Sequence, residues 1–451
     1  MKYMKRKILK LAILSLSFAF VNVNLLGQES VLKLDLETAL KIAHDNNPTI
    51  KIADIEIQRV DYAKKEAIGA LLPNLNAVGQ YTDNVMKQVM FMPESFSALM
   101  GGQKYMEMGY KNSYSGVLST QIPIVNFTLW QNIKNKQNDI DIIIEKSRAS
   151  KIEMTKQVKD AYFGVLLSKS SLKVLEQSHK NALETLKNIE NSYKQGVVSE
   201  YDFIRAQVNV NNLNPILINA KNGVELAIMQ LRMILSLPAE QVIETQETLE
   251  SFNDNITLFS EINKETALSQ NSDLKILDYN INGLKNQLKL INTQHLPMLS
   301  ASGNYIYQTQ SEDFNFKEYN WVSSASIGLQ LTVPLFSGMQ KVNQAKQVKM
   351  AIKGLQLQRE YAKDGINLQI QAALNQMKAA KEQLNVNKDA INQAKRGYEI
   401  AKVRYQVGSG TILELNDSEL SLTQSSLNYQ QSLYNFLAAQ ANVEKIMGSI
   451  K

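Results

Sequence analysis

The side chains that could carry out chemistry in this chain are few and scattered. The 451 residues contain no cysteine and only three histidines, His44, His179 and His295, which lie far apart in the sequence. The chain has no metalloprotease helix, phosphate-binding loop, dinucleotide fingerprint or nucleophile elbow. Its many carboxylates lie on polar helix faces, where solvation is their usual role. We therefore predict that the protein is not an enzyme and needs no cofactor.

Charged side chains do recur at a fixed distance after two tight turns. Tyr193-Lys-Gln-Gly196 recurs as Tyr405-Gln-Val-Gly408, an offset of 212 residues. The glycine in each suits the left-handed position that ends a helix. Ser199-Glu-Tyr-Asp202 and Thr411-Ile-Leu-Glu414 follow, with the hydroxyl and carboxylate spacing that caps a new helix. The elements that position these charges are therefore helices that reverse sharply.

The turns belong to a longer internal repeat. Its other paired motifs are Leu72-Pro73 with Leu296-Pro297, and Pro123 with Pro334. The offset falls from 224 to 211 between these two pairs, because the first copy carries a longer loop there. We predict a tandem duplication, with one structural repeat at 28–250 and a second at 251–451.

Most of each copy has a helical pattern. Apolar residues spaced close to 3-4-3-4 form one stripe per copy, which is typical of a coiled-coil seam. The stripe comprises Leu172, Leu175, His179, Ala182, Leu186, Ile189 and Tyr193, and then Leu384, Asn387, Ile391, Ala394, Tyr398, Ala401 and Tyr405. His179 aligns with Ile391, so we interpret it as a seam residue. A helix from about 127 to 193 would be about 100 Å long, far more than a compact domain.

Each copy also contains two strands in which apolar and polar residues alternate. We expect them at about 74–83 and 113–123, and at about 298–308 and 321–334. About ten residues is the length of a tilted membrane strand, and the polar faces are rich in Ser, Gln, Asn and Thr, as suits a wet lumen. The aromatic residues at one end are Tyr81, Tyr114, Tyr305, Tyr307 and Trp321. A half-buried soluble sheet remains the alternative.

Four strands cannot close a barrel, and edge strands cannot stay unpaired in hydrocarbon. If the strands are membranous, several chains must therefore share one barrel. Two, three or four copies would supply about 8, 12 or 16 strands.

The N-terminus indicates export. Five basic residues within 1–10 precede an apolar run, Leu11–Val21, that is too short to span a bilayer and has the layout of a secretory signal. We predict a signal peptide at 1–27. Its removal lowers the formal charge from +6 to about +1, so we expect no nucleic-acid partner.

In this order, the motifs resemble outer-membrane efflux and secretion channels of the TolC type, over essentially the whole mature chain. The resemblance is carried by the turns at 193–207 and 405–416, by the Leu-Pro pairs and by Val333-Pro-Leu-Phe-Ser-Gly338. The lead-in from Leu36 to Pro48 also resembles the start of the family. The first copy departs from the pattern at 121–126, which lacks the usual Phe and Gly.

The resemblance implies a mainly α protein with membrane β-structure. In this family a homotrimer shares a 12-stranded barrel in the outer membrane, and a long coiled-coil helical barrel extends into the periplasm. The implied function is the exit duct of a tripartite efflux pump. Its partners would be outer-membrane lipid, a periplasmic adaptor and an inner-membrane RND or ABC transporter. The alternatives are a type I protein secretion channel and, in a different class, a periplasmic adaptor.

The resemblance also places a pore gate beside the turns. In the family, acidic residues just after the second turn ring and narrow the pore, and Glu414 and Asp417 match them by position. Capping is the alternative role for Glu414. The first-copy counterpart of Asp417 is Arg205, so we hypothesise that these two pair across neighbouring hairpins, with Asp202 nearby. Gly410 stands where family members often carry a basic latch residue.

The turns themselves are the predicted contacts for the adaptor. The residues concerned are Gly196, Val197, Ser199, Gly408, Ser409 and Thr411.

Residues 83–112 contain six methionines, whose soft thioethers suit Cu(I) or Ag(I). They are Met86, Met90, Met92, Met100, Met106 and Met108. The resemblance places this loop outside the cell, away from the periplasmic entrance. Methionine also serves as an adaptable filler, and Gly101-Gly102 is typical of a mobile loop. We therefore predict no metal site.

Overall fold

The computed structural model describes residues 31–99, 101–253 and 264–448. The predicted signal peptide and its cleavage site lie outside these residues. The described chain divides into two compact units. Unit 1 contains residues 31–47, 154–253 and 375–442, and unit 2 contains 48–153, 264–374 and 443–448.

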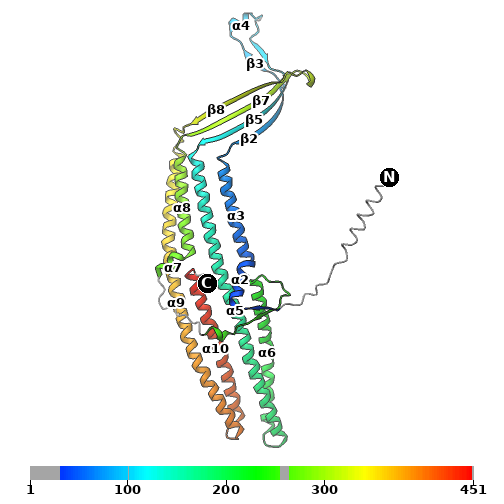
Figure 1. The fold of residues 1–451 in the computed structure, drawn as a ribbon, viewed down its shortest axis with the longest axis vertical. Coiled ribbons are helices and arrows are strands. Elements are labelled where there is room, and N and C mark those ends of the chain that lie inside the picture. Colours follow the sequence, from blue (N-terminus) through cyan, green and yellow to red (C-terminus); the bar gives the residue numbers. More distant parts are fainter. Residues whose placement is uncertain (1–30, 100, 254–263, 449–451) are drawn as a thin grey trace, which may run out of the picture. The chain divides into compact units, whose positions relative to one another are not determined.

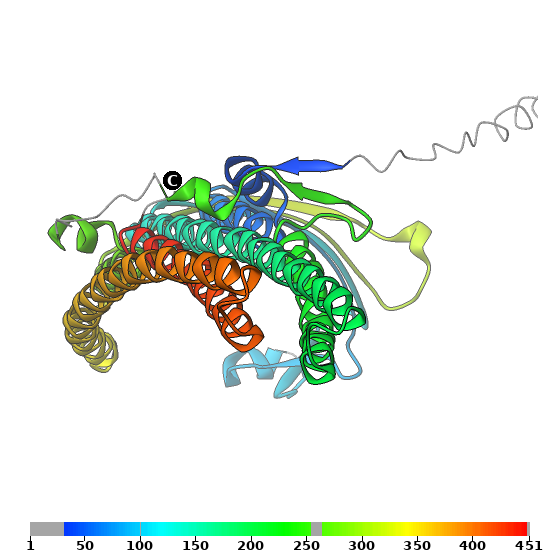
Figure 2. The ribbon, with the colours of Figure 1, turned by 90° about the horizontal axis from the view of Figure 1, so that it is seen from below.

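Two helical hairpins make up most of unit 1 (Figure 1). Helix α5 (Phe127–Lys194) returns as α6 (Glu200–Ile234), and α9 (Gln340–Gln406) returns as α10 (Ile412–Ile446). Helices α5 and α9 both begin in unit 2 and, at 68 and 67 residues, are each about 100 Å long. Both turns lie at the same end of unit 1. Figure 2 shows the hairpins from that end, the first in green and the second in orange and red.

The predicted seam lies on the packed side of these helices. Leu175, Ala182, Ile189 and Leu384 are buried, and the other members are half-buried except Tyr193, which is 38% exposed. Burial of aliphatic side chains at coiled-coil spacing removes apolar surface from water along the whole hairpin, which is the main source of its stability.

A small parallel sheet and one tyrosine fasten the N-terminal segment to α5. Strand β1 (Leu32–Leu34) pairs with β6 (Ile243–Thr245). The hydroxyl of Tyr162, on α5, is fully buried and lies 2.8 Å from the Glu247 carboxylate and 3.1 Å from the carbonyl oxygen of Leu34. Burial raises the pKa of Tyr162, and the neighbouring carboxylate raises it further, so the hydroxyl keeps its proton and donates it.

Unit 2 contains a four-stranded antiparallel sheet in the order β2-β5-β7-β8 (Figure 1). Its strands are β2 (Asn74–Asp83), β5 (Asn112–Val125), β7 (Met298–Ser311) and β8 (Val322–Thr332). Among the described residues of the single chain, β2 and β8 each pair on one side only. The sheet therefore has two open edges.

One face of this sheet is apolar and uncovered. Ile327, Leu329 and Leu331 of β8 are 92%, 72% and 65% exposed. Their direct partners on β7 are Gly303, Ala301 and Leu299, so the same face of β7 is also apolar or small. An exposed aliphatic face of this kind indicates contact with lipid or protein.

Aromatic rings gather at one end of the sheet, as predicted for four of the five residues. Tyr81 lies directly opposite Tyr114, with ring centroids 4.9 Å apart. Tyr307 stacks on Trp321 at 4.8 Å. Tyr305 lies two residues deeper along β7. Three further rings were not predicted: Phe314 lies near Tyr81, and Phe316 and Tyr319 lie near Tyr114, in or beside the 3₁₀-helix η2 (Phe316–Glu318).

The first strand-to-helix junction is capped by an asparagine. Strand β5 continues past Pro123 with a register irregularity before Val125. The side chain of Asn126 then accepts hydrogen bonds from the backbone N–H groups of Thr128 and Leu129, at 3.1 and 3.2 Å. Asn126 therefore caps α5.

Shorter helices complete the structure. They are α2 (Leu36–Asn46), α3 (Pro48–Gly69), α4 (Glu94–Leu99), α7 (Lys264–Gln270), α8 (Ser272–Thr293) and the 3₁₀-helix η1 (Leu249–Phe252). Across residues 31–99, 101–253 and 264–448, none of the helices combines the length and apolar character needed to cross a bilayer.

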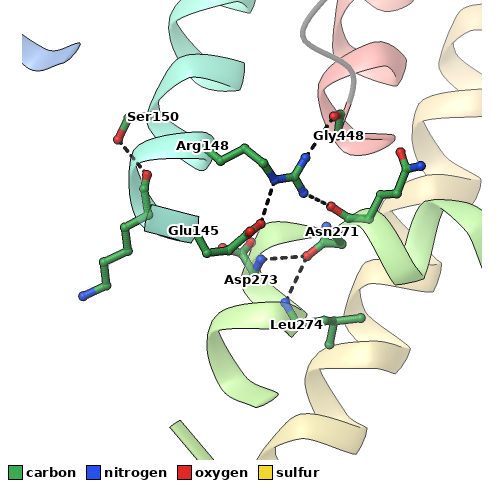
Figure 3. Close-up of polar contacts among 9 residues, drawn as sticks. Glu145, Arg148, Ser150, Asn271, Asp273, Leu274 and Gly448 are labelled. Carbon is green, nitrogen blue, oxygen red and sulfur yellow. Dashed lines mark hydrogen bonds and ion pairs between the residues drawn. The ribbon is translucent and has the colours of Figure 1, made fainter. Parts of the chain in front are cut away.

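Arg148 joins three segments of unit 2 (Figure 3). Its guanidinium, on α5, donates to the Glu145 carboxylate at 2.9 Å, to the Gly448 carbonyl at 3.3 Å, and to the carbonyl oxygen of Gln270 at the end of α7. Gly448 has φ +72°, and a Cβ there would lie 3.0 Å from the Gln270 oxygen. Glycine is therefore required where the segment after α10 passes α7.

Candidate functional site at the helix turns

The two turns have the same backbone geometry. Gly196 and Gly408 both have φ +72°, which confirms the left-handed position predicted for each. In the first turn the N–H of Gly196 donates to the Tyr193 carbonyl and the N–H of Val197 to the Ser192 carbonyl, both at 2.9 Å. The second turn repeats both bonds, one of them onto Arg404. This pair of hydrogen bonds satisfies the last carbonyls of α5 and α9 and ends each helix sharply.

Side-chain caps start both returning helices. Ser199 Oγ accepts from the N–H of Asp202 at 3.2 Å and donates to the Asp202 carboxylate at 2.7 Å. Thr411 Oγ1 accepts from the N–H of Glu414 at 3.2 Å, and the Glu414 carboxylate accepts from the N–H of Thr411 at 3.3 Å. The second arrangement is a full capping box. Glu414 therefore has the capping role that the sequence left as an alternative.

A basic side chain does cross the second turn, from a position that the sequence analysis missed. Arg404, in the last turn of α9, donates to the Ser409 carbonyl at 3.2 Å and lies 3.7 Å from the Glu414 carboxylate. A Cβ on Gly410 would lie 3.1 Å from Arg404 Cβ and 3.2 Å from the Glu414 carboxylate. Gly410 thus leaves room for the Arg404–Glu414 pair. The first turn has Ser192 at the matching position, so it has no such cation.

Asp417 and Arg205 lie one turn further along α10 and α6. Asp417 is exposed and Arg205 is half-buried. In the described part of a single chain, no ion pair joins them or holds either one elsewhere. Both charges are therefore available to a neighbouring hairpin.

An apolar cluster holds the two hairpins together near their turns. Its buried members are Ile189, Ala206, Ile412 and Leu415, with Leu186, Val198, Phe203, Tyr398 and Tyr405 packed around them. The rings of Tyr193 and Phe203 stack in parallel at 5.4 Å. Burial raises the pKa of Tyr405, and the negative charge of Asp202 on the other hairpin raises it further. Asp202 therefore faces the second hairpin.

A cavity of about 520 Å³ separates the hairpins beside this cluster. Side chains of α5, including Asn181 and Glu184, line one wall, and Tyr398, Lys402 and Tyr405 of α9 line the other. The turns also expose two apolar side chains, Val197 and Val407, at 72% and 71%. Exposed valines beside a polar cleft suit contact with another protein.

One buried acid near the turns was not anticipated. Glu419 on α10 is 4% exposed, and neither carboxylate oxygen has a hydrogen-bond partner among the described residues. Burial raises the pKa of Glu419 to about 7, although the Asn181 amide and the Lys402 ammonium oppose the shift. Its position on a helix otherwise rich in polar residues gave no sequence signal of burial.

The methionine-rich segment forms a hairpin. Strand β3 (Gln88–Phe91) pairs with β4 (Tyr105–Met108), and Met90 lies directly opposite Met106. Met100 lies outside the described residues. Among the described residues, no three side chains of His, Asp or Glu gather as metal ligands.

The chain is similar to known proteins over most of its length. A family model described as outer membrane efflux protein matches residues 39–236 and 264–449. AprF, the alkaline protease secretion protein of Pseudomonas aeruginosa, is 22% identical over 230 residues, which cover 50% of this chain and 47% of AprF. The outer membrane protein TolC of Vibrio cholerae is 22% identical over 341 residues, which cover 74% of this chain and 72% of TolC. The AprF match thus spans about half of that protein.

The fold has solved counterparts. The crystal structure of the Campylobacter jejuni CmeC outer membrane channel superposes with a TM-score of 0.72 at 18% identity, covering 92% of this chain and 85% of CmeC. At this identity the likeness establishes the fold alone. The predicted resemblance to TolC-type channels and the mainly helical fold are confirmed. The internal duplication stays a prediction.

Proposed function

Because the chain belongs to the outer membrane efflux protein family, we propose that three copies of it form the exit duct of a tripartite pump. The protein is an outer-membrane efflux or secretion channel with a large periplasmic helical part. Its family is one of transport channels, and we assign it no catalytic step. Substrates pass through it from the periplasm, or from an inner-membrane pump, to the exterior.

The open edges of the four-stranded sheet carry this proposal. Each of β2 and β8 leaves a row of backbone donors and acceptors unpaired within one chain. In hydrocarbon these groups must be satisfied, and closing the sheet with other copies does so. Three copies supply about 12 strands, which is within the range of membrane barrels. The uncovered Ile327, Leu329 and Leu331 suit the lipid side of such a wall.

The helix turns are the proposed docking end. The exposed Val197 and Val407, the polar cleft and the two capped turns suit a helical partner, such as a periplasmic adaptor. The adaptor would connect the duct to an RND or ABC transporter in the inner membrane. Asp202, Arg205, Glu414 and Asp417 form the proposed gate around the axis of the trimer, where the carboxylates of three copies would raise the local concentration of cations.

Protein secretion is the second candidate function. The name of AprF refers to secretion of an alkaline protease, and the same duct geometry would serve that purpose. Here the cargo depends on the inner-membrane transporter, so the gene neighbours of the channel would distinguish the two.

The test is the assembly and conductance of the mature protein. Extracted in detergent, it should have the mass of three chains by native mass spectrometry. Inserted in a planar bilayer, it should give discrete steps of current. A stable monomer that remains in water without detergent would contradict the proposal.

A further inference from the structure

Glu419 is an ionisable residue in a buried position that disfavours charge. It lies one turn beyond Leu415 of the apolar cluster and two residues beyond Asp417. Its side chain is 4% exposed, neither oxygen makes a hydrogen bond of normal geometry among the described residues, and the Asn181 amide is close enough to favour the charged form. A carboxylate buried without partners is strongly disfavoured, whereas the neutral acid is tolerated.

Three helices surround this carboxyl. From α5, Ser178 is buried against the adjacent turn of α10, where its hydroxyl accepts a hydrogen bond from Thr423 at 3.1 Å. The charged and titratable neighbours are Lys402 and Tyr398 on α9, with His179 and Glu184 beside Asn181 on α5. On α10 itself, Asp417 is exposed and Glu414 is held in its capping box.

The balance of these groups favours a neutral carboxyl. Loss of hydration is the largest influence, and it raises the pKa of Glu419 from its ordinary 4.5 to about 7. Asn181 and Lys402 favour the charged form, but they offset only part of the effect. The negative charge of Glu419 also helps to raise the pKa of Tyr398, so the two side chains are close enough to interact.

We propose that Glu419 is a proton-operated lock on the helix turns: the neutral acid packs α10 between α5 and α9 and keeps the tips together, and release of its proton to water favours their separation. This inference rests on the proposed channel function and names the group that regulates its gate.

The direction of the response follows from proton linkage. In a separated tip Glu419 faces water and ionises near its ordinary pKa of 4.5, whereas in the packed tip its pKa is about 7. The packed tip therefore binds the proton more tightly. Its stability is greatest below pH 4.5, falls as pH rises between 4.5 and 7, and is constant above. Within that window the open population rises by at most about tenfold per pH unit.

Single-channel recording of the full mature protein in planar bilayers between pH 4.5 and 8 tests the lock. Wild-type closed-state conductance should rise more than about tenfold from pH 5 to 7 and then level off. Glu419→Gln keeps the shape but cannot ionise, so its conductance should stay low and flat. Glu399→Gln, which makes the same change at an exposed site on α9, should retain the rise. An equal rise in Glu419→Gln, or no rise in the wild type, would overturn the proposal.

A second measurement does not depend on conduction. Because the chain has no cysteine, Ala206→Cys places one thiol in the buried cluster. The rate at which maleimide labels this thiol is divided by the rate for a separate Gln406→Cys variant, whose thiol is exposed. This ratio should rise from pH 5 to 7 when Glu419 is present and should stay constant when Glu419→Gln is added. Flat labelling with Glu419 refutes the lock. A labelling rise without any channel current would refute the channel function and leave the lock standing.

Discussion

Arg205 and Asp417 are two opposite charges that a single chain leaves unpaired, and each lies one turn beyond a helix cap. Asp202 and Glu414 are held by their own caps, and Glu414 also lies 3.7 Å from Arg404 across the turn. The charges left free for contacts between hairpins are therefore those one turn further on. We propose that they meet when the turns of several copies close around an axis.

Replacing Arg205 by alanine should then raise closed-state conductance, by up to about fivefold for a pair that is partly screened by water. The measurement is single-channel current in planar bilayers. Asp417→Asn should have a similar effect, and the double variant should add little to either. Arg396→Ala, at an exposed site on α9, is the control and should leave the current unchanged. An unaltered closed state in Arg205→Ala would refute the pairing.

Arg148 should stabilise unit 2, because its guanidinium donates hydrogen bonds to three acceptor groups. Glu145 is buried beside it, and the carbonyls of Gly448 and Gln270 both use its donors. Arg148→Met removes all three interactions and leaves a buried carboxylate unpaired, so we expect a loss of about 2–3 kcal/mol. A lower melting temperature of the detergent-solubilised protein would reveal it.

The control is Arg59→Met, because the Arg59–Glu56 pair on α3 is largely exposed, with 66% of the arginine side chain accessible. Exposed pairs contribute little, so this variant should melt close to the wild type. Equal melting temperatures for Arg148→Met and the wild type would contradict a stabilising role for the Arg148 contacts.

At the scale of elements, a feature could be predicted from the sequence when nearby residues determine it, and was missed when it depends on packing. Each turn glycine was predictable because a left-handed residue after a helix has few alternatives. The buried seam was predictable from spacing alone. Arg404 was missed because its role depends on the reach of a side chain across the turn to Glu414. Glu419 was missed because its burial needs α5 and α9 to pack around α10 together, and α5 is far from it in sequence.

The two faces of β8 provide a test of its environment. Ile327 lies on the exposed apolar face, and Gln330, three residues along, lies on the opposite one. Ile327→Lys should prevent stable membrane insertion, because a lysine facing lipid near the midplane costs about 2–4 kcal/mol. Gln330→Lys should insert normally and alter ion selectivity, measured as the reversal potential in a salt gradient. Normal insertion of both variants would contradict a lipid-facing apolar side.

At the scale of the whole molecule, the strand pattern and the family resemblance predicted different features of the assembly. Four alternating strands per chain, if they lie in a membrane, require that chains share a barrel, but they allow two, three or four copies. Only the resemblance selected three. The division into two units was not foreseen, because the predicted boundaries followed the repeat, whereas the units cut across it within α5 and α9. A duplicated sequence does not have to fold as two separate halves when each long helix serves both regions.

The unpaired edges of β2 and β8 have a genetic consequence. If each copy completes its wall with the strands of its neighbours, a chain that folds but cannot present one edge would still enter assemblies and spoil them. If the assembly is the proposed trimer, equal expression and random mixing would leave only about one assembly in eight with three intact copies. Such an allele would be dominant over a normal gene in the same cell, and its severity would depend on the ratio of the two products.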